Sequence, residues 1–144
     1  MYRRILFPTD GSDITAKALS TAIQLAKLTG ATIEVLSVTE PFPYSGISEI
    51  QPIAPTEFMD AQKRVASARV KVALDAATAA GVNGRGHTVE ALHPWQAITE
   101  QAKALECDLV VMASHGRRGM SALLLGSETQ KVLTHGELPV LVVR

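Results

Sequence analysis

Two loops of the sequence carry residue types that bind anions and hydroxyl groups. Residues 8–12 (PTDGS) place a carboxylate and two hydroxyls directly after a short apolar segment. Residues 112–119 (MASHGRRG) follow another apolar segment, and a helical pattern begins shortly afterwards. Glycine allows close backbone approach, and the amide N–H groups at a helix start favour an anion. Gly116, Gly126 and Ser127 therefore predict a phosphate-binding site.

Neither loop carries the residues of a known centre for rapid phosphoryl transfer or hydrolysis. The chain contains no GK[ST] sequence, no nucleophile-elbow motif and no acidic pair on a strand. Its 4 histidines are scattered without metal-ligand spacing, and Cys107 has the context of a buried thiol at a strand start. We therefore expect a binding site without catalytic residues and without a metal centre.

The segments that would position the loops alternate between strand-like and helical patterns. Short apolar or β-branched runs predict strands at 3–7, 32–38, 87–89, 108–113 and 139–143. Apolar residues at helical spacing predict one helix that ends near Gly30 and others at 58–81, 95–105 and 127–135. This alternation predicts an α/β fold, a doubly wound, Rossmann-like five-stranded parallel sheet with helices on both faces. The two loops meet only if the first and fourth strands are neighbours, and the predicted strand order is 3-2-1-4-5.

Length and composition narrow the class further. The 144 residues predict a single domain, 1–144, and the hydrophobic fraction of 47% predicts a substantial core without a membrane span. Lys plus Arg and Asp plus Glu both number 14, so no positive excess points to nucleic acid or to an anionic membrane. One cysteine and a strand-like start without a signal-peptide pattern lead us to expect a cytoplasmic protein.

The run 113–116 (ASHG), followed after nine residues by 126–127 (GS), closely resembles a motif of the universal stress proteins. The resemblance covers the whole chain, including residues 5–12 (ILFPTDGS) and the terminal run 138–143 (LPVLVV). The ATP-binding branch of that family is marked by G-x-x-G, nine residues and G-[S/T], and Ala113 stands where the motif has its first glycine. Because alanine is the smallest substitute, we expect the site to be retained with altered affinity.

The resemblance implies a regulatory stress-response module that binds ATP or ADP, with or without Mg²⁺. Because the chain lacks a Walker lysine and an acidic pair on a strand, we expect slow ATP hydrolysis at most. It implies that the ribose and adenine lie against Pro8, Thr9, Asp10 and Val38. It implies that the ribose and phosphates follow Met112, Ala113 and Gly116, and that the phosphates meet Gly126, Ser127, Glu128 and Thr129. It also implies a homodimer, which would cover the apolar edge strand at 138–143 by pairing it with its twin.

Structural interpretations of the same residues stay open at this point. Asp10 is also typical of a turn and a helix N-cap. Ser127 with Gln130 three residues later matches a capping box, which explains the serine without a ligand. Arg117 and Arg118 are more typical of a solvated surface loop than of a phosphate site.

Two further functional hypotheses compete with nucleotide-dependent regulation. One is a dimeric interaction module of the same fold that holds no nucleotide, with Ala113 as the sign of a decayed site. The other is an enzyme, a slow ATPase or an adenylate-forming relative, although residues 8–12 lack the paired glycine of the SGGxDS pattern. The proline-rich residues 40–55 exclude a regular helix and predict a flap or a contact surface.

Overall fold

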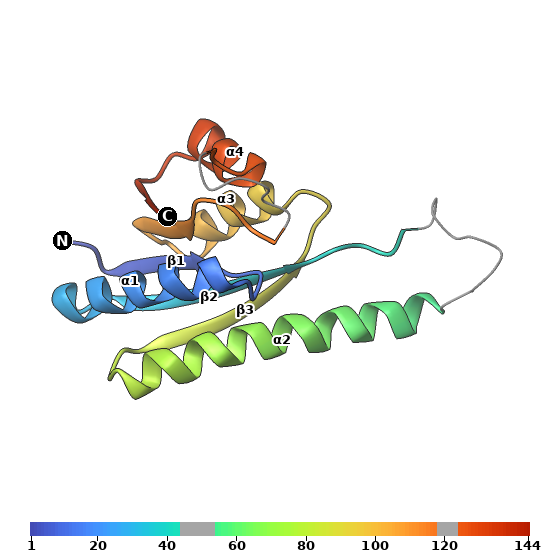
Figure 1. The fold of residues 1–144 in the computed structure, drawn as a ribbon, viewed down its shortest axis with the longest axis horizontal. Helices are drawn as coiled ribbons and strands as arrows, with labels where there is room; N and C mark the ends of the chain where they lie inside the picture. The colour runs from blue at the N-terminus through green and yellow to red at the C-terminus, as the bar shows by residue number, and fades with distance from the viewer. Residues whose placement is uncertain (44–53, 118–123) are drawn as a thin grey trace.

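Strands and helices alternate along the chain in the computed structural model, which describes residues 1–43, 54–117 and 124–144 (Figure 1). The elements are β1 (Arg4–Pro8), α1 (Asp13–Thr29), β2 (Thr32–Thr39), α2 (Pro55–Ala79), β3 (Gly84–Glu90), α3 (Pro94–Ala104), β4 (Leu109–Ala113), α4 (Ser127–His135) and β5 (Val140–Val143). The predicted flap at 40–55 lies mostly outside the described residues, as does Arg118. None of the helices that the structure describes is long and apolar enough to cross a membrane.

The strands of the described chain form one parallel sheet in the order β3-β2-β1-β4-β5. β1 pairs with β2 on one side and with β4 on the other, and every neighbouring pair is parallel. The predicted strand order is therefore confirmed. Because the order reverses between β1 and β4, their carboxyl ends mark the switch point at which doubly wound sheets bind ligands.

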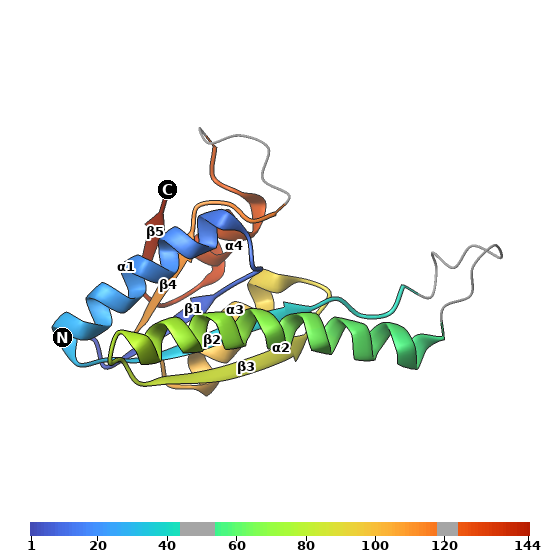
Figure 2. The same cartoon turned by 60° about the horizontal axis from the view of Figure 1, so that its bottom comes forward.

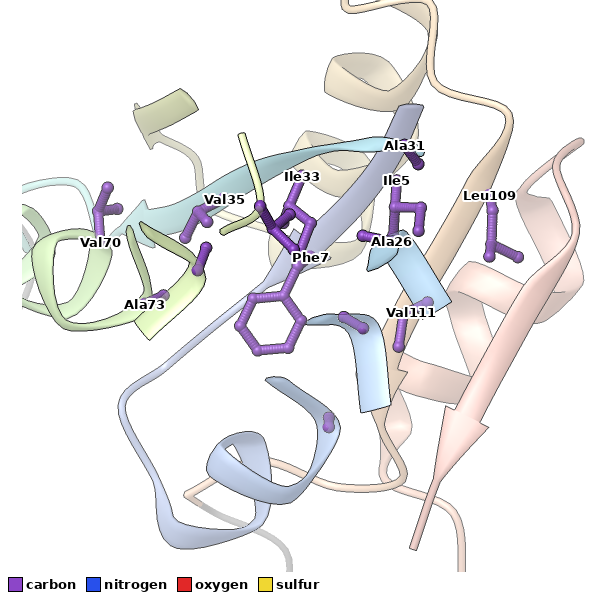
Figure 3. Packing of buried hydrophobic residues seen from close by; sticks show 14 of the residues in the cluster. Ile5, Phe7, Ala26, Ala31, Ile33, Val35, Val70, Ala73, Leu109 and Val111 are labelled. Atoms are coloured by element: carbon purple, nitrogen blue, oxygen red, sulfur yellow. The ribbon is translucent and has the colours of Figure 1, made fainter. Parts of the chain in front are cut away.

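Helices cover both faces of the sheet, as predicted (Figure 1). α1 and α2 pack on one face, and α3 and α4 pack on the other. Leu6 and Phe7, adjacent in β1, belong to different cores, because successive side chains of a strand point to opposite faces. Phe7 is 1% exposed and lies among the apolar side chains of the α1–α2 core (Figure 3). Each large side chain buried in this way contributes about 1.5–3 kcal/mol.

The contact between α2 and β3 is unusually close. β3 begins at Gly84, three residues before the strand that the apolar pattern predicts. A Cβ added to Gly84 would lie 2.8 Å from Leu74 Cδ2 of α2, and one added to Gly86 would overlap Val70 of the same helix. The two glycines interrupt the apolar pattern, so the sequence does not reveal the first residues of this strand. Glycine suits both positions because α2 occupies the space that a side chain would fill. Beyond this contact, the amino-terminal part of α2 runs on past the sheet (Figure 1, Figure 2).

Candidate functional site

The loop after β1 is held by hydrogen bonds within itself and to β2. The Thr9 N–H donates to the Leu36 carbonyl (2.8 Å), and the Gly11 N–H donates to Thr9 Oγ1 (3.2 Å). Gly11 has a φ of 76°, a left-handed conformation that glycine adopts without strain. α1 then begins with Ser12, not Asp10, as its N-cap, so the N-cap interpretation of Asp10 is wrong.

Asp10 joins the loops that follow β1 and β4. Its Oδ1 accepts the N–H of Ser12 (2.9 Å), a hydrogen bond that closes the predicted turn. Its Oδ2 accepts the N–H of Arg117 (2.7 Å). Gly116 permits this approach, because a Cβ added there would lie 2.6 Å from Asp10 Oδ2. The two loops that carry the predicted site residues therefore meet at the carboxyl edge of the sheet.

The start of α4 lies against the same loop. Gly126 is the N-cap of α4, and its N–H donates to the Ser114 carbonyl (2.7 Å). A Cβ added to Gly126 would lie 3.0 Å from His115 Cα, a tight contact, so glycine favours the close approach of the two segments. The capping-box interpretation of Ser127 is wrong, because Ser127 follows the N-cap and Gln130 donates its side-chain amide to Leu125 instead. The exposed Ser127 lies in the first helical turn, where main-chain N–H groups lack helical acceptors.

Met112 and Ala113 end β4 with their side chains in the two cores. Met112 is 6% exposed and belongs to the α3–α4 core, whereas Ala113 is 5% exposed and belongs to the α1–α2 core. Among the described non-glycine residues, a positive φ occurs at Glu106 and not at Ala113. The extra methyl group of Ala113 is therefore absorbed by the core, and the conformational freedom of a glycine is not required there.

Glu128 and Thr129 use their side chains to hold α4 in place. Thr129 is buried, and its hydroxyl donates to the Ala113 carbonyl (3.0 Å). Glu128 Oε2 accepts the main-chain N–H of Trp95 at the start of α3 (2.8 Å), and the Trp95 ring lies 4.6 Å from that of His135 at the end of α4. These contacts leave the main-chain N–H groups, rather than the two side chains, as the part of α4 that faces an anion.

Pro8 and Val38 complete the set of predicted residues. Pro8 ends β1 and is half-buried, and Val38 is the penultimate residue of β2. Val38 packs against the α3–α4 core and pairs with Val89 of β3. Both residues therefore lie toward the carboxyl edge, on strands that neighbour the loop of Asp10.

Arg69 is a further charged residue at this edge, and it was not predicted. A Cβ added to Gly11 would lie 3.1 Å from Arg69 Cγ, so this side chain from α2 covers the loop after β1. Burial, followed by the positive charge of Arg117, lowers the pKa of the Arg69 guanidinium, while the charge of Asp10 acts in the opposite direction. The sequence shows Arg69 as one of several basic residues along a helix, with no signal that sets it apart. Asp10, Arg69, Gly116, Arg117 and Ser127 are called the edge site below.

A second charged group lies within the sheet and is called the Glu34 cluster: Glu34, Arg4, Arg85 and His87. Glu34 is 1% exposed, and its Oε2 lies 2.7 Å from His87 Nε2. Its Oε1 lies 3.9 Å from Arg4 Nε and 3.7 Å from Arg85 Nη1. Burial, followed by the negative charge of Glu34, raises the pKa of the nearby Cys107 thiol to about 12. Basic side chains from β1 and β3 thus surround one buried carboxylate.

The fold and the edge site together define a class of protein. It is a doubly wound parallel α/β domain in which the loops after the first and fourth strands meet at the switch point. Comparison with known proteins narrows this class to one family. The family model of the Universal stress protein family matches residues 1–144, and the chain belongs to that family.

Known relatives match the chain along its length. A universal stress protein of Thermus aquaticus is 34% identical over 145 residues, which cover 100% of both chains. The solved structure of the universal stress protein UspA from Lactobacillus plantarum has a TM-score of 0.85 and 25% identity, over 99% of this chain and 98% of that one. A universal stress protein solved in complex with cAMP has a TM-score of 0.74 and 27% identity, over 99% of this chain and 97% of that one.

Proposed function

We propose that the chain binds an adenine nucleotide, ATP or ADP, at the edge site and acts as a cytoplasmic regulatory protein of the stress response. The observation that carries this proposal is the hydrogen bond from the Arg117 N–H to Asp10 Oδ2 (2.7 Å), which joins the two loops. The start of α4 lies beside the same loop through the bond from Gly126 to Ser114. A carboxylate and a helix start therefore lie around one glycine loop, and the similar protein in complex with cAMP supports an adenine ligand.

Each part of the nucleotide would meet groups that suit its chemistry. The base and ribose would lie along Pro8, Thr9, Asp10 and Val38, and each Asp10 oxygen has a lone pair left to accept a ribose hydroxyl. The phosphates would follow the main chain of Met112, Ala113 and Gly116 to the first turn of α4, at Gly126, Ser127, Glu128 and Thr129. The exposed hydroxyl of Ser127 is available to a phosphate, whereas that of Thr129 already donates to Ala113.

The described residues do not form a protein-held Mg²⁺ site. In the ranges 1–43, 54–117 and 124–144, no group of three or more His, Cys, Asp or Glu side chains could hold a metal ion. Mg²⁺ prefers oxygen ligands and retains several waters, so it would enter on the nucleotide phosphates. We expect slow ATP hydrolysis at most, because the loops carry neither a Walker lysine nor an acidic pair.

We also propose that the protein acts as a homodimer through residues 138–143. β5 lies at the end of the sheet with β4 on one side, and Leu141 is 38% exposed. An unpaired apolar edge strand favours pairing with another chain, and a two-fold axis would satisfy both copies. The carbonyl of Pro139 accepts the N–H of Val110 in β4, and the carbonyl of Val143 accepts that of Ser114 directly after β4. The alternate residue Val142 therefore turns its N–H toward the open side.

Calorimetric titration of the nucleotide-stripped protein with ATP and Mg²⁺ tests the nucleotide proposal. Ser127→Glu and Ser127→Gln form a matched pair that differs in charge and hardly in size. We expect Ser127→Glu to weaken ATP binding by about tenfold or more, while its charge stabilises the start of α4. Ser127→Gln also loses the hydroxyl but adds no negative charge, so it should bind ATP more tightly than Ser127→Glu does.

The outcomes separate the competing functions. Absence of ATP binding by the original protein at millimolar ATP would contradict the proposal and favour the nucleotide-free module. Multiple-turnover release of phosphate would favour the slow ATPase. Gly126→Val is less informative, because its side chain would press on His115 and distort the loop as well as block the phosphates.

Sedimentation analysis of Val142→Pro tests the proposed dimer. Proline removes the outward N–H of Val142 and leaves the hydrogen bonds of Pro139 and Val143 to β4 in place. We expect this variant to sediment as a monomer and Val142→Thr to sediment as a dimer. Dimers of both variants would exclude pairing through this edge.

A further inference from the structure

The edge site holds two guanidinium groups whose charges are not matched within it. Arg69 comes from α2, Arg117 comes from the loop after β4, and Asp10 lies between these elements. In the part of the chain that the structure describes, neither arginine forms an ion pair, although the Glu34 cluster and several surface residues do. Both oxygens of Asp10 are already engaged by main-chain N–H groups. One carboxylate therefore lies beside two basic residues and forms an ion pair with neither.

The structure fixes the position of Arg69 from two directions. Its stem lies on the loop after β1, since a Cβ added to Gly11 would lie 3.1 Å from Cγ, 3.4 Å from Cδ and 3.3 Å from Nε. The next residue, Val70, is 7% exposed and fills the space over Gly86 of β3. A shift of α2 along the sheet would lose both contacts. The packing of α2 thus holds the guanidinium of Arg69 over the loop that carries Asp10.

The electrostatic balance at this position favours an incoming anion. The pKa of Arg69 is lowered by burial first and by the charge of Arg117 second, so the two guanidinium groups repel each other. Guanidinium groups bind phosphate through two parallel hydrogen bonds, and such charge-assisted bonds are stronger than neutral ones. A phosphate between the two groups would replace their repulsion with two attractive contacts.

We infer that Arg69, together with Arg117, forms a binding position for the phosphate chain of the nucleotide, which makes affinity rise with the number of phosphates. This inference rests on the proposed function, because it concerns the same site. It assigns to α2 a direct contact with the ligand, in addition to its packing on the sheet. ATP should bind more tightly than ADP, and ADP more tightly than AMP, and Arg69 should account for much of this order.

Titration of ATP, ADP and AMP into three forms of the full chain tests the inference. Arg69→Gln keeps the Cγ and Cδ atoms that cover Gly11 and removes the charge. Arg64→Gln is the matched control, because Arg64 is an exposed residue of the same helix. We expect Arg69→Gln to weaken ATP binding about tenfold to thirtyfold and AMP binding at most about threefold. The Arg64 variant should bind all three nucleotides as the original protein does.

The results distinguish the inference from the proposed function. If Arg69→Gln leaves the preference for ATP over AMP unchanged, Arg69 does not contact the phosphate chain, and the nucleotide proposal still holds. If the original protein binds none of the three nucleotides, both proposals fail. Arg69→Lys is a control for a possible folding defect in Arg69→Gln. It keeps the positive charge, so it should preserve the preference for ATP over AMP at an unchanged melting temperature. An Arg69→Lys variant that folds but binds ATP and AMP equally would also overturn the inference.

Discussion

The edge site and the Glu34 cluster are two groups of charged residues on the same sheet, and their carboxylates are engaged in different ways. In the Glu34 cluster, a carboxylate that is 1% exposed has three basic side chains around it, the nearest at 2.7 Å. At the edge site, Asp10 is engaged by main-chain N–H groups, and Arg69 and Arg117 repel each other.

This difference separates charges that hold the fold from charges that can bind a ligand. A buried carboxylate is costly without partners, and the neighbouring strands surround Glu34 with three basic side chains. Among the residues that the structure describes, the two arginines of the edge site form no ion pair, and they lie beside the start of α4 at the position where the strand order reverses. Perturbing the two regions should therefore affect different properties of the molecule.

Removal of the buried carboxylate should give the largest effect. We expect Glu34→Ala to lower the free energy of unfolding by about 3 kcal/mol, because it leaves a cavity and three basic groups without their partner. ATP affinity should stay within about twofold of the original value, a change below about 0.5 kcal/mol. Urea unfolding and calorimetric titration measure the two quantities. Glu106→Ala is the control, since Glu106 pairs with Arg4 at the surface. A large loss of ATP affinity in Glu34→Ala would remove the distinction between the regions.

The thiol beside the Glu34 cluster should make stability fall in alkaline solution. The pKa of Cys107 is about 12 in the folded protein, against an ordinary value of 9.0. Below pH 9 the thiol is protonated in both the folded and the unfolded state, so its ionisation does not affect the free energy of unfolding. Above pH 9 the unfolded chain loses the proton while the folded chain retains it, so the free energy of unfolding falls by about 1.4 kcal/mol per pH unit.

Urea unfolding between pH 9 and 10.5 measures this fall, which should amount to about 2 kcal/mol from Cys107. Cys107→Ala should show a correspondingly smaller loss over the same interval. If the free energy of unfolding falls equally with pH in the two proteins, the thiol ionises in the folded protein as readily as in the unfolded chain, and the prediction is wrong.

A methyl group at the edge site should affect ligand binding more than folding. In Gly116→Ala the new Cβ would lie 2.6 Å from Asp10 Oδ2 and would push the two loops apart. We expect ATP affinity to fall about tenfold, equivalent to about 1.4 kcal/mol. Gly30→Ala provides the control, because a Cβ added to Gly30, at the end of α1, would meet no atom within 4 Å. Its left-handed φ of 73° should make this change cost about 1 kcal/mol of stability without an effect on ATP binding.

Added salt should give the smallest effect and should act on one region only. An increase from about 0.1 M to 1 M shortens the screening length from about 10 Å to 3 Å, which weakens contacts with an exposed phosphate. We expect ATP binding to weaken severalfold over this range. The stability difference between the original protein and Glu34→Ala should change by less than about 0.5 kcal/mol, because buried charges are screened much less. Equal salt dependence in calorimetry and in urea unfolding would contradict this separation.

The sheet and the meeting of its loops could be predicted because they follow from short-range patterns and general rules. Alternating strand and helix patterns define the parallel sheet, and right-handed crossovers limit its possible topologies. Gly116 and Gly126 were identifiable because glycine in a loop before a helix is typical of close main-chain approach. A Cβ at Gly116 would overlap Asp10 Oδ2, and one at Gly126 would make a tight contact with the backbone of His115.

Features that depend on the rotation or register of distant elements could not be predicted. Arg69 faces the edge site because α2 packs into the space left by Gly84 and Gly86. This packing sets the rotation of α2 about its axis, which cannot be predicted from the sequence pattern of the helix. Glu34 stands out in an apolar strand, but its partners come from neighbouring strands through the register that pairs Glu34 with Arg85. Ser127 is a better N-cap residue than glycine by preference, yet the close approach of the chain at His115 places Gly126 in that role.

The contacts of Trp95 have an optical consequence. It is the only tryptophan in the sequence, its ring lies 4.6 Å from His135, and its main-chain N–H is held by Glu128 in the first turn of α4. A single fluorophore therefore lies at the junction of α3 and α4, with its ring against the end of α4 and its main chain tied to the first turn of that helix. Its emission spectrum therefore reports on the packing of α4 against α3 without any added label, so a displacement of α4 can be followed in the unmodified protein by fluorescence.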